Sequence, residues 1–405
     1  MPATKSTLTL GDDCVVVVGF GPVGAVAAFA LARRGVHVVV IEADDHVHTD
    51  PSESRASTFH PPTLEMLDSI GVFDELFASG LVAPTYQMRD RQQGVIAHFD
   101  LGMLSGDTRF PFRLQSEQQN LVAIIERRLR DLPNVRMIFG APLEEVQVVG
   151  ERCRLKLGGV HPHTVDARWV MAADGSNSAA RRSLDIDFPG LTYPERFLVI
   201  STTYPMQEAL PGIAPVNYVS DAAEWFVLLQ TPRHWRALFP VSGDEDPATL
   251  QAPEAVEARM QRIAAIEGNY PVSHTTLYNV HQRVAAAFRR GPLLLAGDAG
   301  HINNPLGGMG MNSGIHDAFA AVEALTLAMA GTSVALDEYD ATRRDAALNF
   351  VQKATHRNWE QLQERDPAVR AARNDRMRRL AADPQQAHDY LLTSSMLGSR
   401  PTPVG

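Results

Sequence analysis

The chain has 405 residues, of which 45% are hydrophobic and 21% are charged, and its formal net charge at pH 7 is −10. This length and composition are typical of a globular protein with two or more domains. The negative charge argues against general binding to nucleic acid or to an anionic membrane surface. Two cysteines, Cys14 and Cys153, are too few for a disulfide framework, so we expect a cytoplasmic protein, and no metal site is predicted.

The first predicted unit is a strand, a helix and a second strand. The β-branched run Val15–Val18 is short, as in a strand that is covered on both faces. The helix Val23–Arg34 follows, and Val36–Ile41 supplies the next strand. Apolar length alone would also fit a membrane span or a signal sequence over Cys14–Ala32. The glycines and the proline within this segment, and the acids before it, favour a soluble βαβ unit instead.

The turn of this unit carries the pattern G-x-G-x-x-G at Gly19, Gly21 and Gly24. The first glycine permits a tight turn, the second lets the backbone approach a pyrophosphate, and the third lets the helix pack closely on the strand. Pro22 falls in the first helical turn, where its missing N–H costs nothing. Glu42 follows the second strand, where a carboxylate can bind both hydroxyls of a ribose. The segment therefore predicts a dinucleotide site.

Alternating strands and helices are predicted along the next part of the chain. The predicted helices are Thr63–Ile70 and Ser116–Arg130. The predicted strands are Gly94–Phe99, Val135–Phe139, Leu143–Val149, Arg152–Leu157 and Val165–Ala172, with a hairpin around Gly158-Gly159.

From Phe188 to Val284 the pattern changes to short aromatic-rich strands that alternate with prolines. It predicts a mostly antiparallel sheet, with one helix, inserted into the nucleotide-binding domain. The strands are Arg196–Thr203, Val216–Val219, Glu224–Leu229 and Arg236–Pro240, and the helix is Pro253–Ile266. The charged tail, 336–395, is predicted to be helical and to pack on the surface or at a subunit contact such as that of a homodimer.

Two later segments join the end of a strand to a polar turn. In AADGSNSAARR, residues 172–182, an apolar strand ends at Asp174-Gly175. In the segment 293–319, the strand Leu293–Ala296 ends at Gly297-Asp298, and a loop through Pro305 leads to a long helix that begins near Asn312. Gly297-Asp298 alone would fit an ordinary strand-ending turn. Together with the first glycine turn, it predicts ligand binding at the carboxyl edge of a parallel sheet.

With these three motifs in order, the chain resembles the FAD-dependent aromatic hydroxylases, the class A flavoprotein monooxygenases with the p-hydroxybenzoate hydroxylase fold. The resemblance covers roughly residues 14–345. It implies an α/β fold: a Rossmann-like FAD-binding domain of the glutathione-reductase type, an inserted, mostly antiparallel substrate-binding sheet, and a helical C-terminal tail. The predicted boundaries are 1–87, 113–187 and 285–345 for the first domain, 88–112 and 188–284 for the second, and 346–405 for the tail.

The resemblance also implies which residues bind FAD. Those that match the family's motifs are Gly19, Gly21, Pro22, Val23, Gly24, Glu42, Arg55, Gln118, Asp174, Asp298, Pro305, Gly308, Gly310, Met311 and Asn312. Asp298 matches the acid that binds the ribityl chain, and Asp174 matches an acid implicated in both flavin and reduced-nicotinamide binding. Gln115 is the alternative to Gln118 if the register differs, and Met309 departs from the polar residue often found at its position.

The charge of reduced flavin agrees with this assignment. Reduced flavin carries negative charge near N1 and the C2 carbonyl, and the helix that begins near Asn312 offers free N–H groups and a positive dipole end. The glycines at 307, 308 and 310 allow the backbone to lie against the ring.

The family's reaction needs NADH or NADPH, dioxygen and an aromatic substrate. The resemblance implies that NAD(P)H reduces FAD and that a flavin C4a-hydroperoxide then hydroxylates a phenol or a hydroxylated heteroaromatic ring. The protein must exclude water from this site. Only one G-x-G-x-x-G unit is visible, so we expect NAD(P)H to bind transiently. No side chain is assigned a certain catalytic role.

The ring pocket is expected between the inserted sheet and the flavin. Its candidate lining residues are Tyr204, Tyr218, Trp225, Phe226 and Trp235. Because neighbouring residues of a strand face opposite ways, Trp225 and Phe226 cannot line the same cavity. Arg236, Arg283, His234 and His281 are candidates for binding a substrate carboxylate or phenol, although a surface or structural role explains each of them as well.

Other functions fit parts of the same pattern. A reductase of isoprenoid chains would keep the fold and turn over without oxygen. A flavin-dependent halogenase would carry a Trp-x-Trp-x-x-Ile signature, which this chain lacks. A non-enzymatic flavoprotein redox sensor would bind partners through the charged tail. The sequence does not decide the ring substrate, the position hydroxylated, the choice between NADH and NADPH, or the oligomeric state.

Overall fold

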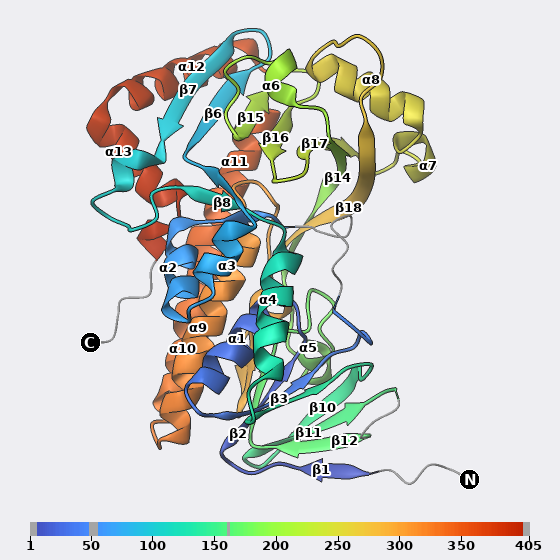
Figure 1. Ribbon diagram of the computed structural model, residues 1–405, viewed down its shortest axis with the longest axis vertical. Helices are drawn as coiled ribbons and strands as arrows, with labels where there is room; N and C mark the ends of the chain where they lie inside the picture. The colour runs from blue at the N-terminus through green and yellow to red at the C-terminus, as the bar shows by residue number, and fades with distance from the viewer. Residues whose placement is uncertain (1–5, 48–55, 160–162, 400–405) are drawn as a thin grey trace.

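Two large sheets organise the protein. The computed structural model describes residues 6–47, 56–159 and 163–399 (Figure 1). A six-stranded sheet occupies the lower half of Figure 1 and an eight-stranded sheet the upper half, with long helices running alongside both.

The six-stranded sheet has the order β19-β20-β13-β2-β3-β9. Its strands are β19 (Arg289–Arg290), β20 (Leu293–Leu295), β13 (Trp169–Ala172), β2 (Cys14–Val18), β3 (His37–Ile41) and β9 (Val135–Ile138). All neighbours from β20 to β9 pair in parallel, and β19 pairs antiparallel with β20. Every residue of β2 is buried, as its run of valines predicted.

Helices cover this sheet. They are α1 (Pro22–Arg33), α4 (Gln118–Arg130), α9 (Gly310–Met329) and α10 (Val334–Asp345), with α2 (Pro61–Ser69), α3 (Phe73–Ala78) and the short α5 (Ala179–Ser183) beside them. Helix α1 packs on both α4 and α9, and its residues from Gly24 to Ala32 are all buried. No helix in the described ranges is long and apolar enough to cross a bilayer.

Two smaller sheets complete the fold. The four-stranded sheet has the order β1-β12-β11-β10, with β1 (Thr7–Thr9), β10 (Leu143–Val149), β11 (Arg152–Leu157) and β12 (Thr164–Ala167). The antiparallel pairing of β11 with β12 confirms the predicted hairpin. The three-stranded sheet has the order β4-β8-β5, with β4 (Thr58–Phe59), β8 (Arg113–Gln115) and β5 (Leu81–Ala83).

The eight-stranded sheet has the order β21-β18-β14-β17-β16-β15-β6-β7. Its strands are β6 (Thr85–Asp90), β7 (Gly94–Asp100), β14 (Gly190–Thr202), β15 (Val216–Ser220), β16 (Phe226–Gln230), β17 (Trp235–Ser242), β18 (Val272–Val284) and β21 (His301–Ile302). Only β15 and β6 pair in parallel, so the sheet is mostly antiparallel, as predicted.

Two boundaries of this sheet differ from the prediction. Strand β14 begins at Gly190 rather than Arg196, because the irregular register between Thr192 and Arg196 accommodates Pro194, which lacks an N–H for the ladder. Strand β6 begins at Thr85, so the domain boundary predicted at residue 88 falls inside a strand.

The two faces of the eight-stranded sheet belong to different cores. Trp225 and Val227 pack in one cluster with Tyr218, whereas Phe226 packs on the other face with Phe239. The second face is covered by α8 (Pro253–Ile263), next to the short helices α6 (Met206–Ala209) and α7 (Pro247–Leu250). The predicted alternation of this strand is therefore confirmed.

The tail covers the first face. It consists of a π-helical turn (Ala346–Gln352), α11 (Lys353–Gln363), α12 (Pro367–Ala382) and α13 (Pro384–Ser394), and it ends in a short turn at Leu397–Ser399. In Figure 1, α12 and α13 lie beside β6 and β7 at the upper left. Leu362, Met377 and Leu391 of the tail share the hydrophobic cluster of Tyr218 and Trp225. The tail thus packs against its own chain.

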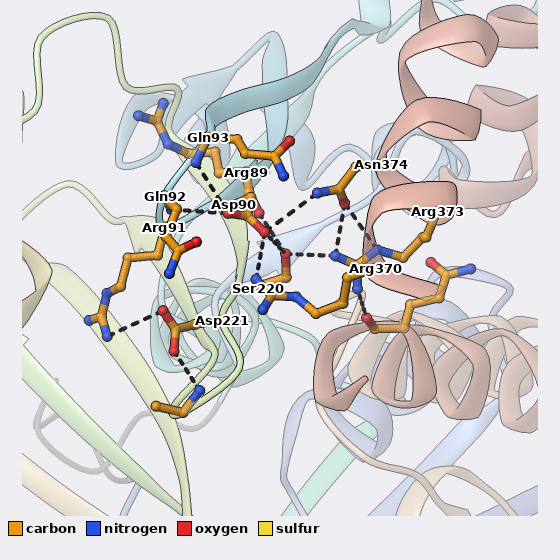
Figure 2. A network of polar contacts seen from close by, with 12 residues as sticks. Arg89, Asp90, Arg91, Gln92, Gln93, Ser220, Asp221, Arg370, Arg373 and Asn374 are labelled. Atoms are coloured by element: carbon orange, nitrogen blue, oxygen red, sulfur yellow. Dashed lines mark hydrogen bonds and ion pairs between the residues drawn. The ribbon is translucent and has the colours of Figure 1, made fainter. Parts of the chain in front are cut away.

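A polar network fixes α12 to the ends of β6 and β15 (Figure 2). Arg370 donates to Asp90 over 2.6 Å, and Arg373 donates to the hydroxyl of Ser220 over 2.8 Å. Burial acts to raise the pKa of Asp90, but the N–H groups of Gln92 and Gln93 and the charge of Arg370 together hold it below its usual range. The tail is therefore attached by a buried ion pair as well as by apolar contacts.

Candidate functional site

The three sequence motifs converge at one edge of the six-stranded sheet. Gly19 directly follows β2, and Glu42 directly follows β3. Asp174 comes two residues after β13, and Asp298 comes three residues after β20. Because these strands are parallel neighbours, their carboxyl ends meet at the same edge.

The glycine turn has the geometry that its pattern predicted. Gly19 has a φ of +92°, and a Cβ atom there would lie 2.4 Å from the carbonyl oxygen of Ala173. A Cβ atom at Gly24 would lie 2.0 Å from the carbonyl oxygen of Gly19, so the first and third glycines are required by packing. A Cβ atom at Gly21 would meet no atom within 4 Å. The second glycine leaves open space beside the start of α1, as a ligand that approaches the backbone needs.

A cavity of about 320 Å³ lies at the start of α1. We call it the Glu42 cavity; it is lined by Phe20, Gly21, Pro22, Glu42, Asp44, His46, Val47, Gln118, Gln119, Val122 and Phe139. The Glu42 carboxylate accepts hydrogen bonds from the N–H groups of Phe20, over 2.5 Å, and Asp44, over 3.0 Å, which fix its position. Helix α1 has no side-chain cap, so its first N–H groups remain available to an anion.

The structure distinguishes the two candidate glutamines. Gln118 begins α4 and lines the Glu42 cavity, whereas Gln115 is fully buried and accepts a hydrogen bond from the hydroxyl of Thr58 over 2.9 Å. Arg55, the other residue predicted near this region, lies outside the described residues.

Asp174 presents an unsatisfied oxygen at the same edge. Its Oδ2 accepts a hydrogen bond from the N–H of Ala180 over 3.0 Å, and its Oδ1 is buried without a partner within the described ranges. Such an orphaned carboxylate oxygen is costly unless a ligand donates to it. This oxygen fits a hydroxyl or N–H donor of a dinucleotide, and the open space at Gly21 fits its phosphates.

The turn before Asp298 is packed between two helices. A Cβ atom at Gly297 would lie 2.8 Å from Val23 of α1, and one at Gly314 of α9 would lie 2.6 Å from the same side chain. The close packing of these two glycines on Val23 joins the first motif to the third. Asp298 itself is exposed at the end of the strand.

A buried ion cluster holds this turn in place. Asp317 of α9 accepts hydrogen bonds from the N–H of Gly297, over 3.0 Å, and from Arg343, over 2.7 Å, and its carboxylate lies 2.7 Å from His301 Nε2. Burial acts to raise the pKa of Asp317, but the charges of Arg343 and His301 outweigh burial and hold the pKa below its usual range. The carboxylate therefore remains ionised and braces the sheet edge.

The loop before α9 is braced by Asn312 and His60. Asn312 accepts from the N–H of His60 over 2.9 Å and donates to the carbonyl oxygens of Thr58 and Gly308, each over 2.7 Å. His60 Nε2 donates to the carbonyl oxygen of Gly307 over 2.8 Å. Because the Asn312 side chain is hydrogen-bonded to other parts of the protein, only its backbone is available to a ligand.

Helix α9 begins at Gly310 without a side-chain cap. The N–H groups of Gly310 and Met311 therefore lie unbonded by a cap at the positive end of the helix dipole. Met309, which departs from the family's polar residue, is buried with Val351 and Met396 of the tail. This methionine anchors the loop to the tail.

A smaller cavity of about 40 Å³ lies between this loop and the first face of the eight-stranded sheet. We call it the Arg113 pocket; it is lined by Thr58, Arg113, Val216, Tyr218, Val227, Leu229, Leu238, Pro305, Leu306, Gly307 and Gly308. Most of its walls are aliphatic, and the loop side is formed by backbone at the two glycines. Pro305 and Gly308 were predicted beside the flavin ring.

Only part of the predicted ring lining faces this pocket. Tyr218 lines it, and Trp225 packs in the cluster behind it. Tyr204, Phe226 and Trp235 lie in the hydrophobic cluster on the other face of the sheet, so they do not line the pocket. The sequence predicts which side chains point to the same face of a strand, but not which face of the sheet packs against the loop.

Several pocket residues were missed by the sequence analysis. Among them are the aliphatic residues Val216, Leu229 and Leu238 and the charged residue Arg113. Arg113 lies in a strand of three residues, which carries no motif. The basic candidate Arg236 is instead buried 3.4 Å from Glu117.

The family model for the FAD binding domain matches residues 13–354. The chain belongs to this family. The match includes all three motifs that meet at the sheet edge, so the mixed α/β protein has an FAD-binding domain.

Known relatives extend over nearly the whole chain. Para-nitrophenol 4-monooxygenase from Pseudomonas sp. (strain WBC-3) is 33% identical over 398 residues, which is 96% of both chains. The 6-hydroxy-3-succinoylpyridine 3-monooxygenase HspB from Pseudomonas putida (strain DSM 28022 / S16) is 31% identical over 87% of this chain and 90% of its own. The crystal structure of p-nitrophenol 4-monooxygenase PnpA from Pseudomonas putida DLL-E4 has a TM-score of 0.90 at 32% identity, and the match covers 98% of this chain and 100% of that one.

These similarities confirm the resemblance to FAD-dependent aromatic hydroxylases. The protein is an enzyme of the flavin-dependent aromatic monooxygenase type.

Proposed function

We propose that this enzyme hydroxylates a phenol or a hydroxylated heteroaromatic ring, with NADH or NADPH and dioxygen as co-substrates. The observation that carries the proposal is the position of the Arg113 pocket. One wall of this pocket is the Pro305–Gly308 loop, which the sequence resemblance implies lies beside the flavin ring, and the other wall is an apolar sheet face. Both named relatives act on hydroxylated rings, p-nitrophenol and a 6-hydroxypyridine, which supports the same class of substrate.

In this proposal FAD extends along the edge of the six-stranded sheet. Glu42 holds the adenosine ribose, and the first N–H groups of α1 hold the pyrophosphate. Asp298 binds the ribityl chain, and the orphaned Oδ1 of Asp174 accepts a hydrogen bond from flavin or nicotinamide. When bound, FAD supplies the redox chemistry, since it takes electrons from reduced nicotinamide and activates dioxygen for transfer of one oxygen atom to the ring.

The chain's own residues prepare the ring site. The N–H groups at the start of α9 stabilise negative charge on the pyrimidine end of the flavin. Gly307 and Gly308, with φ values of +101° and +65°, bring backbone rather than side chains to the pocket. The aliphatic side chains opposite them exclude water, which protects the reaction from unproductive loss of oxygen as hydrogen peroxide.

The domain assignment follows from the same arrangement. We assign the six-stranded sheet and its helices to a Rossmann-like FAD-binding domain of the glutathione-reductase type, and the eight-stranded sheet to substrate binding. The substrate part then begins at Thr85, with β6. Both cysteines are buried and free, which is compatible with a reducing cytoplasm.

The test is oxygen incorporation by the purified holoenzyme. Single-ring phenols and hydroxypyridines are supplied with NADH or NADPH under labelled dioxygen, and product mass is recorded. We expect a substrate-stimulated oxidation of NAD(P)H and a product that gains one labelled oxygen atom. Turnover without oxygen would favour the reductase, and a protein that retains no FAD would refute the proposal.

A further inference from the structure

Arg113 is a buried arginine without an acidic partner in the described part of the chain. Its side chain is 2% exposed, it makes no ion pair with any carboxylate of the described residues, and its Nε has no hydrogen-bond acceptor there. Arg343 and Arg370 are buried beside the carboxylates of Asp317 and Asp90. Arg181, which is buried without an ion pair in the described part of the chain, donates from both terminal nitrogens to carbonyl oxygens, those of Ala299 and Ser176. Because a buried charge is costly unless it is paired, Arg113 marks a place where an anion is missing from the protein itself.

Two neutral groups hold Arg113 without cancelling its charge. Its Nη2 donates to the carbonyl oxygen of Ser394 over 3.3 Å, at the C-terminal end of α13, where the helix dipole is negative. Its guanidinium carbon lies 4.5 Å from the centre of the Tyr86 ring, in cation–π contact. These contacts orient the guanidinium, and its other N–H donors have no hydrogen-bond acceptor among the described residues.

Arg113 also lines the pocket in which the aromatic ring is proposed to bind. Arg113 is the charged residue of the pocket lining, and the hydroxyl-bearing residues beside it are Tyr218 and Thr58. Thr58 already donates its hydroxyl to Gln115. The rest of the lining is aliphatic or backbone. A compact ring with a negative oxygen complements this combination of one positive charge and apolar walls.

We propose that Arg113 binds the ionised oxygen of the aromatic substrate, so that the pocket selects the phenolate form of a hydroxylated ring. This inference rests on the proposed function. The phenol loses its proton to solvent before binding, so no side chain of the pocket has to act as a base. The ionised oxygen raises the electron density of the ring, which is what an electrophilic oxygen donor requires.

The groups that face Arg113 do not supply the pH dependence themselves. Burial, the charge of Arg113 and that of His316 hold the pKa of His60 well below its usual range. Burial raises the pKa of both Tyr86 and Tyr390 above the usual range for tyrosine. The remaining titratable group of the lining is Tyr218, which a Tyr218→Phe variant removes.

The experiment measures ligand binding to the FAD-loaded enzyme. Single-ring phenols, including 4-nitrophenol, are each compared with their methyl ethers, such as 4-nitroanisole, which cannot ionise. Dissociation constants are obtained from the perturbation of the flavin spectrum between about pH 6 and pH 9, the range where ionisation of an acidic phenol is separated from that of ordinary tyrosine. We expect wild-type affinity for the phenol to rise as the ligand ionises, while affinity for the ether stays constant.

The Arg113→Gln variant is expected to bind the phenolate at least about 30-fold more weakly, because about 2 kcal/mol or more is lost when one member of a buried charge pair is removed. Its affinity for the methyl ether should stay within about twofold, and Arg113→Lys should recover part of the phenolate affinity. Tyr218→Phe should retain the dependence on ligand ionisation. FAD content and melting temperature establish that each variant is folded.

Arg370→Gln is the matched control, since it also removes a buried arginine, but from the tail network of Figure 2. It should lower stability and leave the dissociation constants unchanged. The inference is overturned if no phenol binds preferentially in its ionised form, or if Arg113→Gln weakens phenol and ether equally. Oxygen incorporation is measured in parallel. Arg113-dependent phenolate binding without an oxygenated product would refute the proposed function alone, and hydroxylation unaffected by Arg113→Gln would refute the inference alone.

Discussion

The Glu42 cavity and the Arg113 pocket are built from different kinds of contact. The first is formed mainly by one local unit, β2–α1–β3. Its polar groups are backbone N–H groups and the Glu42 carboxylate, which the N–H groups of Phe20 and Asp44 hold in place. The second is formed by side chains from β4, β8 and the strands β15 to β17, together with the 305–308 loop. The comparison indicates that a site made by backbone geometry leaves a local pattern in the sequence, whereas a site made by distant side chains does not.

The two regions also differ in how they are braced. Behind the edge that carries Asp298, Asp317 joins Gly297, His301 and Arg343 in one buried cluster. In the Arg113 pocket, the charged group is held by a carbonyl oxygen and an aromatic ring of the chain. Substitutions in the first region should therefore affect FAD binding and folding, and those in the second should affect the ring substrate.

Asp317→Asn is expected to have the largest effect. It leaves Arg343 buried without its counter-charge, so unfolding free energy should fall by about 3–5 kcal/mol in chemical denaturation. Asp337→Asn is the control, because the carboxylate of Asp337 is 71% exposed in its pair with Arg289 and such a pair contributes about 0–1 kcal/mol. Equal losses in the two variants would contradict the bracing role.

Asp317 also predicts how stability changes at acidic pH. Since the folded-state pKa of Asp317 lies below its ordinary value, its contribution is complete above that value and is lost as pH falls through the folded-state pKa. Wild-type stability should therefore decline below about pH 4, and Asp317→Asn should show less of this decline. Denaturation curves between neutral and acidic pH measure the difference.

Gly21→Ala and Gly24→Ala separate ligand contact from packing. A methyl group at Gly21 meets no protein atom, so the variant should fold normally and bind FAD about 100-fold more weakly, a loss of about 2.7 kcal/mol. A methyl group at Gly24 collides with the Gly19 carbonyl, so that variant should lose stability as well. FAD titration and melting curves of both proteins decide the matter. Normal FAD binding by Gly21→Ala would show that the pyrophosphate does not bind at this turn.

Glu42→Gln should have a moderate effect on the same cavity. The change removes the charge that strengthens hydrogen bonds to ribose hydroxyls, so FAD affinity should fall about tenfold. Glu145→Gln, at an exposed position of β10, should bind FAD as the wild type does. An unchanged dissociation constant for Glu42→Gln would exclude the ribose role.

Leu238→Ala and Phe239→Leu test the two faces of one strand and should give the smallest effects. Leu238 lines the Arg113 pocket, so its truncation should raise KM for the ring about fivefold and increase hydrogen peroxide release as water enters. Phe239 lies in the opposite cluster, so Phe239→Leu should lower stability by about 1–2 kcal/mol with KM unchanged. A similar rise in KM in both variants would contradict the assignment of faces.

Comparison of particular residues explains which predictions the sequence supported. Gly19 and Gly24 were predicted from spacing because each is required by a backbone contact only a few residues or one strand away. Asn312 was predicted near the flavin from the family's motif, but its side-chain contacts with His60 and Thr58 depend on the packing of segments that are 252 and 254 residues apart. Tyr218 was distinguished from Trp235 only by which face of the eight-stranded sheet packs against the loop.

The amino-acid pattern by itself determined the parallel unit, its glycine turn, the acid after the second strand and the order of the three motifs. Each of these is encoded within one short stretch, because backbone conformation and strand burial are local properties. Only the tertiary structure decided that the tail covers the first face of the sheet and that Arg113 lines the pocket without a carboxylate partner among the described residues. Those features depend on contacts between side chains that are distant in the sequence, and local periodicity does not predict such contacts.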